Sequence, residues 1–354
     1  MSTNNWSGET SASDRISILP RGLREKILGY LPLRDAVRTS VLSRKWRYNW
    51  VVRSELVFDD KVDKGFLLRI FIYKVLSIHQ GALRKFSLIV PNSELFSDID
   101  NWILFLSKKN IQELSLGFLK SMDFRLPSHL FKFQDLKHLE LYSCEFHPPP
   151  NFKGFLSLVA LKFQRVTFEP MSFQTFLSSS PLLERVTMIC CTHFDSFIIE
   201  APSLKFFEFN GTANSLCFKR TPLLEEFVLA MPFNTLESLT VPEPQLTLHN
   251  IKILKLESLM CDCVEWVACA LYLINRCPNL EKLLLASFNF EACVTHPLQS
   301  QVTTMTRSAI KRLKSVDMSL MRITEAEMDF FKQVLSSATA LEKYMHCSFG
   351  RMQS

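Results

Sequence analysis

The sequence is poor in the residues that phosphate-binding loops, metal sites and catalytic turns require. Only nine of its 354 residues are glycine, and no GxGxxG, P-loop, GxSxG or HExxH pattern occurs. Its ten cysteines include no CxxC pair. The CxC at Cys261 and Cys263 and the adjacent Cys190 and Cys191 have no His or Cys partners at zinc-site spacing. We therefore expect no metal, no cofactor and no catalytic residues.

Long apolar runs are also missing. The start, MSTNNWSGETSASD, lacks the basic residues and apolar stretch of a signal peptide. The longest uncharged apolar run, WVACALYLIN from Trp266, is about half of a membrane span. Cysteines in such a chain are expected to be reduced and buried. These absences predict a soluble protein of the nucleus or cytoplasm, with no membrane partner.

Positive charge is concentrated in one short segment. The whole chain carries a net charge of +6, while residues 14–54 hold ten Lys or Arg against three Asp or Glu, a balance of +7. The tail before it holds one Glu, so the remaining residues balance at zero (6 − 7 + 1 = 0). Such a segment favours an acidic partner, either nucleic acid or protein.

A leucine-rich pattern, L-x-x-L-x-L with other apolar residues allowed, recurs along the chain. Its ten copies begin at Leu83, Ile111, Leu136, Leu158, Leu183, Leu204, Leu224, Ile251, Leu280 and Leu313. Their spacings of 20 to 33 residues fall mostly within the 20–29 residues of leucine-rich repeats. A degenerate eleventh copy begins at Leu341, and LESLTV at Leu236 fits the pattern but not the period. The alternative is an α/β domain with leucines spaced by chance.

The pattern explains how the repeats fold. In the copy at Leu136, Leu139 and Leu141 are two residues apart and point to one face of a short strand. One such face cannot be buried alone, but stacked repeats bury a continuous column. The sequence therefore predicts an α/β fold, a curved solenoid of parallel strands and irregular helices. Phe replaces Leu in several copies, which helps to explain the 30 Phe residues without an aromatic ligand site.

Helices are expected between and after the strands. Residues 64–79 are apolar on more than one helix face, which is typical of a buried helix and indicates a packed linker. Residues 264–281 read as a helix that stops before Pro278, whereas LPSHLF and FQTFLSSSPLLE read as shorter helices or turns. Thr324 and Glu327 form a capping box for a helix to Ala338, whose Met328, Phe331 and Leu335 would cap the last repeat.

The basic segment predicts three short helices. Leu23, Ile27 and Leu31 share one helix face, and Leu33, Val37 and Val41 share another. Ser43 would cap a third helix, with Trp46 and Trp50 on one face and the basic residues on the others. About 40 residues without metal or disulfide lie near the limit of independent stability, so a partner is implied.

The string DRIS-x-LP…IL-x-x-LP-x-x-x-AV-x-TSVLS-x-x-WR resembles the F-box of plant F-box proteins. LKSVDM…ITEAEMDFFKQVLSSATALEKYM is similar to the FBD region that follows leucine-rich repeats in that family. Arg21 departs from the family, which often has Asp or another polar residue there. The resemblance implies a disordered tail (1–13), F-box (14–54), packed linker (55–82), leucine-rich repeats (83–300) and FBD-like cap (301–354).

This resemblance also implies a function. F-box proteins of this kind are non-catalytic substrate receptors of SCF-type cullin-RING ubiquitin ligases. Their F-box binds an acidic Skp-type adaptor, and through it cullin, while the repeats bind a target protein for ubiquitination. By the matching motif, the adaptor-binding residues are Leu19, Pro20, Leu23, Ile27, Leu28, Leu31, Pro32, Val37, Val41, Leu42 and Trp46. Some of these must instead close the core of the F-box, and the sequence leaves open which.

The strand positions between core leucines are expected to face the concave side of the solenoid and to bind the target, whose identity is open. They include His138, Glu140, Tyr142, Lys162, Gln164, Arg185, Phe206, Glu208 and Glu226. His138 beside Glu140 could act as a general base, although a polar binding-face pair is the simpler interpretation. Cys191 with His193 could form an activated thiol, although Cys191 occupies a packing position of the repeat.

Two other functions compete with a ligase receptor. One is a repeat scaffold that acts outside any ligase. The other is nucleic-acid binding, because Arg44 to Trp50 hold three basic residues and three aromatics. Stacking on bases requires exposed rings. Trp46 and Trp50 on one helix face indicate burial instead, so we expect no nucleic-acid partner.

Overall fold

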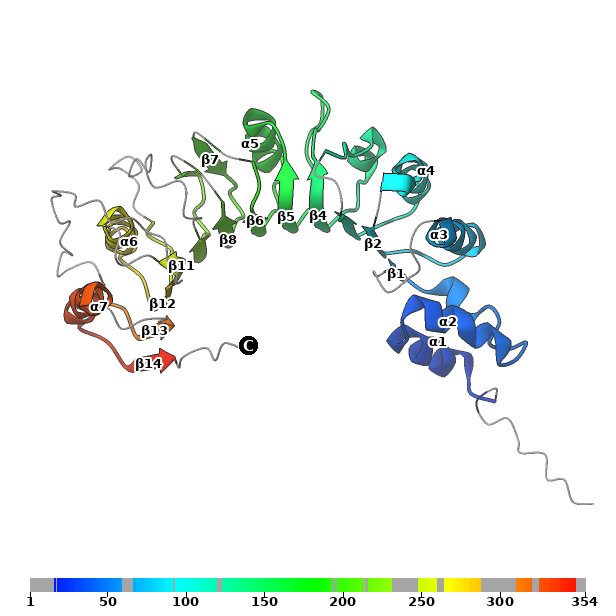
Figure 1. The fold of residues 1–354 in the computed structure, drawn as a ribbon, viewed down its shortest axis with the longest axis horizontal. Coiled ribbons are helices and arrows are strands. Elements are labelled where there is room, and N and C mark those ends of the chain that lie inside the picture. The colour runs from blue at the N-terminus through cyan, green and yellow to red at the C-terminus, as the bar shows by residue number, and fades with distance from the viewer. Residues whose placement is uncertain are drawn as a thin grey trace, which may run out of the picture.

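A computed structural model describes the fold as a curved solenoid. The described residues are 16–58 (except 17), 66–119 (except 92), 123–230 (except 193, 195, 212, 214 and 215), 248–259, 264–287, 310–319 and 325–347. Parallel strands line the inner side of the arc, helices line the outer side, and a small helical unit stands at the N-terminal end (Figure 1). This confirms the predicted α/β solenoid class.

The described strands form a 12-stranded sheet whose neighbours follow chain order except where β7 and β9 leave it. In spatial order the strands of this sheet are β1 (Glu55–Phe58), β2 (Lys85–Val90), β3 (Glu113–Phe118), β4 (His138–Glu145), β5 (Ala160–Thr167), β6 (Arg185–Ile189), β8 (Phe206–Asn210), β10 (Glu226–Ala230), β11 (Ile253–Leu259), β12 (Lys282–Ser287), β13 (Ser315–Ser319) and β14 (Lys343–Cys347). β7 (Phe197–Glu200) pairs with β9 (Leu216–Lys219) in a separate two-stranded sheet.

The helices vary in length from repeat to repeat. The N-terminal unit contains α1 (Arg21–Tyr30), α2 (Leu33–Arg38), η1 (Thr39–Val41) and η2 (Asn49–Val52). The connections between strands contain α3 (Phe66–Ile78), η3 (Ser93–Leu95), α4 (Phe96–Leu106), η4 (Ser128–Lys132), α5 (Pro170–Ser178), α6 (Val264–Asn275) and α7 (Glu325–Ser337). The helices predicted over 64–79 and before Pro278 correspond to α3 and α6.

Each of the ten regular copies of the leucine-rich pattern corresponds to one strand of the main sheet, and the degenerate copy at Leu341 overlaps β14. LESLTV at Leu236 lies outside the described residues. The segment predicted as a packed linker, residues 55–82, begins with a strand, because β1 pairs in parallel with β2 and starts the sheet. Its helix α3 buries Leu68 and Ile72. The pattern missed β1 because Arg53 occupies the position where later repeats have Leu or Ile. β13 and β14 likewise extend the same sheet at the C-terminal end.

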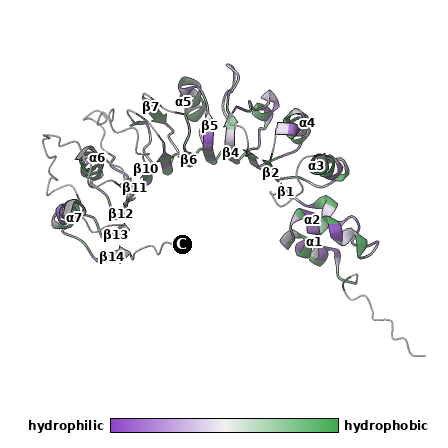
Figure 2. Ribbon diagram, in the orientation of Figure 1, coloured by the Kyte–Doolittle hydropathy of each residue, from purple (hydrophilic) through white to green (hydrophobic). Residues whose placement is uncertain are grey.

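The core is one continuous column of apolar side chains between the strands and the helices. Alternate strand residues enter it, as in β2, where Phe86, Leu88 and Val90 are buried. Phenylalanines from successive repeats touch one another along the middle of the arc, and the ring centroids of Phe146 and Phe163 are 5.0 Å apart. Figure 2 shows apolar and hydrophilic residues along the same ribbon, as in β5. The abundance of Phe therefore reflects packing between repeats.

The C-terminal helix contributes differently from the prediction. Phe331 is buried and Leu335 is half-buried, as expected for a helix that packs on the last repeat. Met328 was predicted to pack there but is exposed, and Phe330 and Val334 are buried instead. Thr324, the predicted cap, lies outside the described residues.

A second set of contacts joins neighbouring repeats at the start of their strands. The residue just before the first core position donates a side-chain hydrogen bond to a carbonyl of the preceding repeat. Ser203 donates to Pro181 O at 2.6 Å, and Asn279 donates to His249 O at 2.6 Å. Asn250 makes the same bond to Pro222 O. Leu182 and Leu223 occupy the equivalent position in two other repeats and are exposed.

We expect Asn279→Ala to lower the free energy of unfolding by about 0.5–1.5 kcal/mol, because it removes one such bond. Leu223→Asn should raise it by a similar amount, because the new amide can reach the carbonyl of Pro202. Chemical denaturation of the two variants and the unchanged chain measures both effects. Equal loss of stability in both variants would contradict this interpretation.

Candidate protein-docking surfaces

The N-terminal unit has a small, well-packed interior. Leu28 of α1 has no exposed surface, Ala36 of α2 is also fully buried, and Trp46 and Trp50 are 2% and 5% exposed. The predicted third helix is wrong: turns cover residues 44–48, and Asn49–Val52 form the short 3₁₀ helix η2. Trp50 Nε1 donates a hydrogen bond to Ser40 Oγ at 3.1 Å, which fixes this ring between the turns.

Burial divides the predicted adaptor-binding residues into three sets. Leu28 and Trp46 lie in the interior and close the core of the F-box, the role that the sequence left open for some of these residues. The half-buried members are Leu19, Leu31 and Val37. The exposed members are Pro20, Leu23, Ile27, Pro32, Val41 and Leu42. Val41 is 87% exposed and Leu42 is 58% exposed, which is unusual for adjacent aliphatic residues.

The prediction missed several exposed apolar side chains of the same unit. Tyr30 at the end of α1 is 80% exposed, and Tyr48, Ile16 and Ile18 are also exposed. The signal for Ile16 was present in the sequence, because it belongs to the DRIS-x-LP string. Basic residues of the same unit are also exposed, among them Arg44, Lys45 and Arg47. Arg21 pairs with Glu25 at 2.7 Å and Arg38 with Asp35 at 3.4 Å, both on the surface.

The N-terminal unit is joined rigidly to the solenoid. The Arg53 guanidinium donates a hydrogen bond to Leu31 O at 3.0 Å, and Gln80 N donates to Val51 O at 3.2 Å. Gly81 lies so close to this segment that an added Cβ would be 2.7 Å from the carbonyl oxygen of Val52. Any other residue at position 81 would therefore push the two parts of the chain apart.

His79 lies buried at this junction. Its Nε2 is 2.8 Å from Arg53 O, so this nitrogen carries the proton and donates it to the carbonyl. Its Nδ1 is buried and has no hydrogen-bond partner among the described residues. Burial lowers the pKa of His79, the bond to Arg53 opposes this shift, and the charge of Lys109 adds to it.

The concave face is formed by the outward residues of the main sheet. Registered pairs align Glu140 with Ser115 and Lys162, and the next row aligns Tyr142 with Gly117 and Gln164. The sheet therefore brings the predicted target-binding residues of β4 and β5 together. Those of β6 and β8 extend the same rows. The predicted residues His138, Glu140, Lys162 and Arg185 are exposed, Tyr142, Gln164, Glu208 and Glu226 are half-buried, and Phe206 is 9% exposed.

Phe206 is covered by a charged neighbour. The Arg185 guanidinium lies 4.0 Å from the centroid of its ring, in a cation–π contact. Thr187 donates a hydrogen bond to Glu208 at 3.1 Å in the next row. This part of the face is therefore already occupied by its own side chains.

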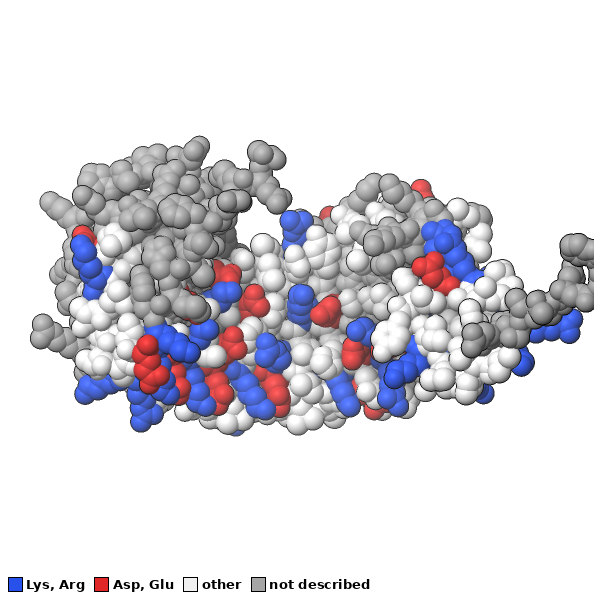
Figure 3. All heavy atoms as spheres, turned by 90° about the horizontal axis from the view of Figure 1, so that it is seen from below, with Lys and Arg blue, Asp and Glu red and all other residues white. Residues whose placement is uncertain are grey.

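Opposite charges alternate along one edge of the concave face, seen in Figure 3. Lys205 pairs with Glu184 at 2.8 Å, Lys252 with Glu225 at 2.8 Å and Lys314 with Glu281 at 3.0 Å, each pair joining neighbouring repeats. Lys314 lowers the pKa of Glu281 by its hydrogen bond and charge, and Glu225 raises the pKa of Lys252 in the same way. Because these ion pairs are exposed, each adds little to the free energy of unfolding. They favour the register in which each repeat stacks on the next.

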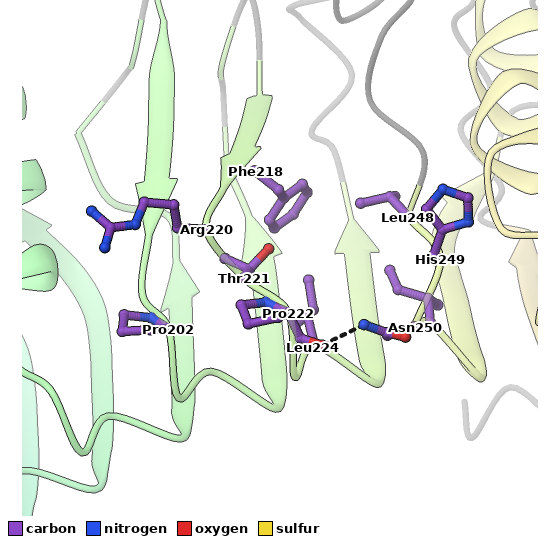
Figure 4. Close-up of a pocket in the computed structure, with 10 residues that line it drawn as sticks. Pro202, Phe218, Arg220, Thr221, Pro222, Leu224, Leu248, His249 and Asn250 are labelled. Atoms are coloured by element: carbon purple, nitrogen blue, oxygen red, sulfur yellow. Dashed lines mark hydrogen bonds between the residues drawn. The ribbon is translucent and has the colours of Figure 1, made fainter.

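Of the hollows along the described residues, two lie on the repeats beyond β1. One, of about 230 Å³, opens on the concave face above Gly117 and is bordered by Ile89 and Tyr142. The other, of about 600 Å³, lies between loops of three repeats, with Phe218, Arg220 and His249 around it (Figure 4). Its lining residue Leu248 directly follows residues 231–247 in the chain, which lie outside the described residues, and we assign no site to this hollow.

The buried cysteines among the described residues are not activated. Burial raises the pKa of Cys191 to about 11 and that of Cys277 to about 12. Cys191 Sγ donates weakly to Phe163 O at 3.6 Å, as a packing residue does. Its predicted partner His193 lies outside the described residues. Cys190, by contrast, is exposed, unlike the buried thiols that the sequence predicted.

The described ranges contain neither a candidate metal site nor a candidate membrane span. In these ranges, no three His, Cys, Asp or Glu side chains gather where they could hold an ion. Nor is any described helix both long and apolar enough to cross a membrane.

Two family models match the chain. The F-box domain matches residues 16–50, and the leucine-rich repeats of the FBD-associated F-box protein At5g56370 match residues 99–242. The sequence-based resemblance to plant F-box/FBD/leucine-rich-repeat proteins is thus confirmed. The FBD-like identity of residues 301–354 and the other domain limits stay predictions.

Curated relatives agree with these matches. The chain is similar to the F-box/FBD/LRR-repeat protein At1g13570 of Arabidopsis thaliana, at 40% identity over 62% of this chain and 54% of the relative. It is also similar to the putative F-box protein At1g49610 of the same plant, at 33% identity over 56% of this chain and 50% of the relative. The putative F-box/LRR-repeat protein At4g15060 is 27% identical over 92% of both chains. The chain thus spans about half the length of the first two relatives.

The junction makes stability depend on pH. Because the folded-state pKa of His79 lies below its unfolded value of about 6.5, the unfolded chain binds the extra proton first as pH falls. The contribution of His79 to the free energy of unfolding is therefore fully present above pH 6.5 and is lost as the pH falls below this value. We expect His79→Gln, which keeps a donor for Arg53 O but does not titrate, to show a smaller fall in melting temperature between pH 7.5 and 5.5. An equal fall in melting temperature in the variant and the unchanged chain would exclude His79 as a source of the pH dependence.

Proposed function

We propose that this F-box and leucine-rich-repeat chain is the substrate-recognition subunit of an SCF-type ubiquitin ligase. Its F-box would bind a Skp-type adaptor, and through it cullin, while the solenoid binds the target protein for ubiquitination. The observation that carries the proposal is the F-box itself. It closes a small core around Leu28 and Trp46, yet leaves Val41, Leu42 and Tyr30 among its most exposed residues.

The charge of the F-box fits the proposed adaptor. Residues 14–54 carry a net charge of +7, and the rest of the chain from residue 55 is neutral overall. Exposed apolar anchors surrounded by positive charge suit a partner that has an apolar groove within an acidic surface. The arrangement is less suited to nucleic acid, because Trp46 and Trp50 are buried and cannot stack on bases.

The chain would contribute binding and not chemistry. His138 and Glu140 project from the exposed concave face, where they suit contact with a protein target better than general-base catalysis. In an SCF-type ligase the transfer of ubiquitin is carried out by other subunits. We further propose that the protein acts in the nucleus or the cytoplasm, where such ligases operate.

A scaffold that acts outside any ligase is the second candidate. The extended concave face supports it, because a solenoid can bind a partner whether or not an adaptor is present. The two candidates differ in what the F-box does. A scaffold would keep its activity when the exposed apolar residues of the F-box are changed.

We expect Val41→Asp to weaken binding of the full chain to a Skp-type adaptor at least tenfold, about 1.4 kcal/mol. The substitution places a charge where an apolar anchor would enter an acidic partner, and an 87% exposed position tolerates it without loss of folding. Titration of purified adaptor, followed by calorimetry, measures the effect.

The matched control is Met171→Asp, which places the same charge on an exposed apolar residue of α5, in the solenoid. It should bind the adaptor like the unchanged chain. Absence of binding by the unchanged chain would refute the ligase proposal, and equal binding by Val41→Asp would remove Val41 from the interface.

A further inference from the structure

We propose that the hollow above Gly117 is a slot that binds one aromatic side chain of the target protein. This inference rests on the proposed function, because it deepens the role of the concave face. The slot lies on β3 between β2 and β4, where register places Gly117 beside Ile89 on one side and Tyr142 on the other. The missing side chain of Gly117 creates the space.

The width of the slot favours a flat occupant. A carbon atom at the position of an added Cβ on Gly117 would lie 3.8 Å from Ile89 Cγ1 and 3.7 Å from Tyr142 Cδ1. Both distances are ordinary van der Waals contacts, so one layer of carbon atoms fills the gap between the two walls. An aromatic ring is one carbon layer thick and would touch both walls at once.

The size of the slot favours a side chain over a free small molecule. Its volume of about 230 Å³ lies below the roughly 300–1,000 Å³ of small-molecule pockets. It is open to the concave face, where a protein segment can lie across the strands. The occupant is therefore one residue of a larger partner.

The residues around the slot are chemically suited to contact an aromatic residue. The Tyr142 wall is held by Arg165, whose Nη1 donates a hydrogen bond to the Tyr142 hydroxyl at 3.4 Å. Glu140, Lys162 and Gln164 border the slot on the β4 and β5 side. They offer an acceptor and two donors for a ring N–H, a ring hydroxyl or the backbone of the target.

The slot is less occupied by its own side chains than the neighbouring part of the face. Further along the rows, the Arg185 guanidinium lies 4.0 Å from the centroid of the Phe206 ring, and Thr187 bonds to Glu208. At the slot, the Arg165 guanidinium is more distant, 6.0 Å from the centroid of the Tyr142 ring. The slot lies on strands β2 to β5, which stand near the middle of the arc (Figure 1). An aromatic anchor here is in the type of pocket where hot-spot residues concentrate interface energy.

The test uses the full chain with methyl-labelled isoleucine and the probe N-acetyl-L-tryptophanamide. A ring stacked on Ile89 shifts the NMR signal of its methyl group through the ring current. We expect a saturable shift with this probe and a shift at least fivefold smaller with N-acetyl-L-leucinamide. No shift of the Ile89 signal, or equal shifts with both probes, would overturn the proposal.

A variant that fills the slot separates binding from folding. Gly117→Val should abolish the probe-dependent shift while leaving the melting temperature unchanged or higher, because glycine weakens a strand interior. Ser319→Val, which adds the same side chain on β13, is the control and should keep the shift. A shift that survives in Gly117→Val would overturn the slot.

The same variant distinguishes this proposal from the proposed function. Gly117→Val should bind the Skp-type adaptor with unchanged affinity. Target proteins are those that accumulate in cells when the unchanged chain is removed. The same proteins should accumulate in cells that contain only Gly117→Val. Normal turnover of those proteins by Gly117→Val would overturn the slot but not the ligase role. Failure of the unchanged chain to bind adaptor would refute the ligase role without affecting the probe result.

Discussion

The structure depends on the stacking of parallel strands, because no single repeat can bury its own apolar face. Each strand donates alternate residues to a core that the next repeat completes, from Leu56 in β1 to Val316 in β13. The phenylalanine contacts between repeats, the Asn and Ser bonds at the strand starts and the Lys–Glu pairs along the edge all join one repeat to the next. Some side chains of the concave face, such as His138 and Lys162, stay exposed in a solenoid held this way, so they can vary for binding.

The F-box and the solenoid act as one connected unit. Arg53 both occupies the first position of the first repeat and donates to the carbonyl of Leu31 in the F-box. His79 and Gly81 close the other side of this junction. In the proposed ligase receptor, this junction would set the position of the target relative to the adaptor. The same junction contains the buried His79, whose lowered pKa makes it sensitive to acid.

Much of the fold could be predicted from the sequence, since the period and the apolar alternation are properties of single residues. Leu136, Leu139 and Leu141 predict their strand without any tertiary information. The first strand escaped because Arg53 stands where the pattern requires an apolar residue. The prediction of a third F-box helix was wrong because the packing of Trp46 and Trp50 in the core overrides the helical spacing of these two residues in the sequence. Burial determines which predicted adaptor residues are accessible, and helical periodicity does not predict the burial of each residue. Leu28 and Ile27 are adjacent, yet Leu28 is interior and Ile27 is exposed. The slot above Gly117 depends on cross-strand register, which no local pattern contains.

The most direct test of the central claim is the mass of the complex that the full chain forms with a purified Skp-type adaptor, measured by light scattering during size exclusion. We expect one species whose mass is the sum of one chain and one adaptor, and which dissociates as salt is raised because the F-box carries the positive charge. Separate elution of the two proteins at low salt would contradict the claim that this F-box is an adaptor-binding module.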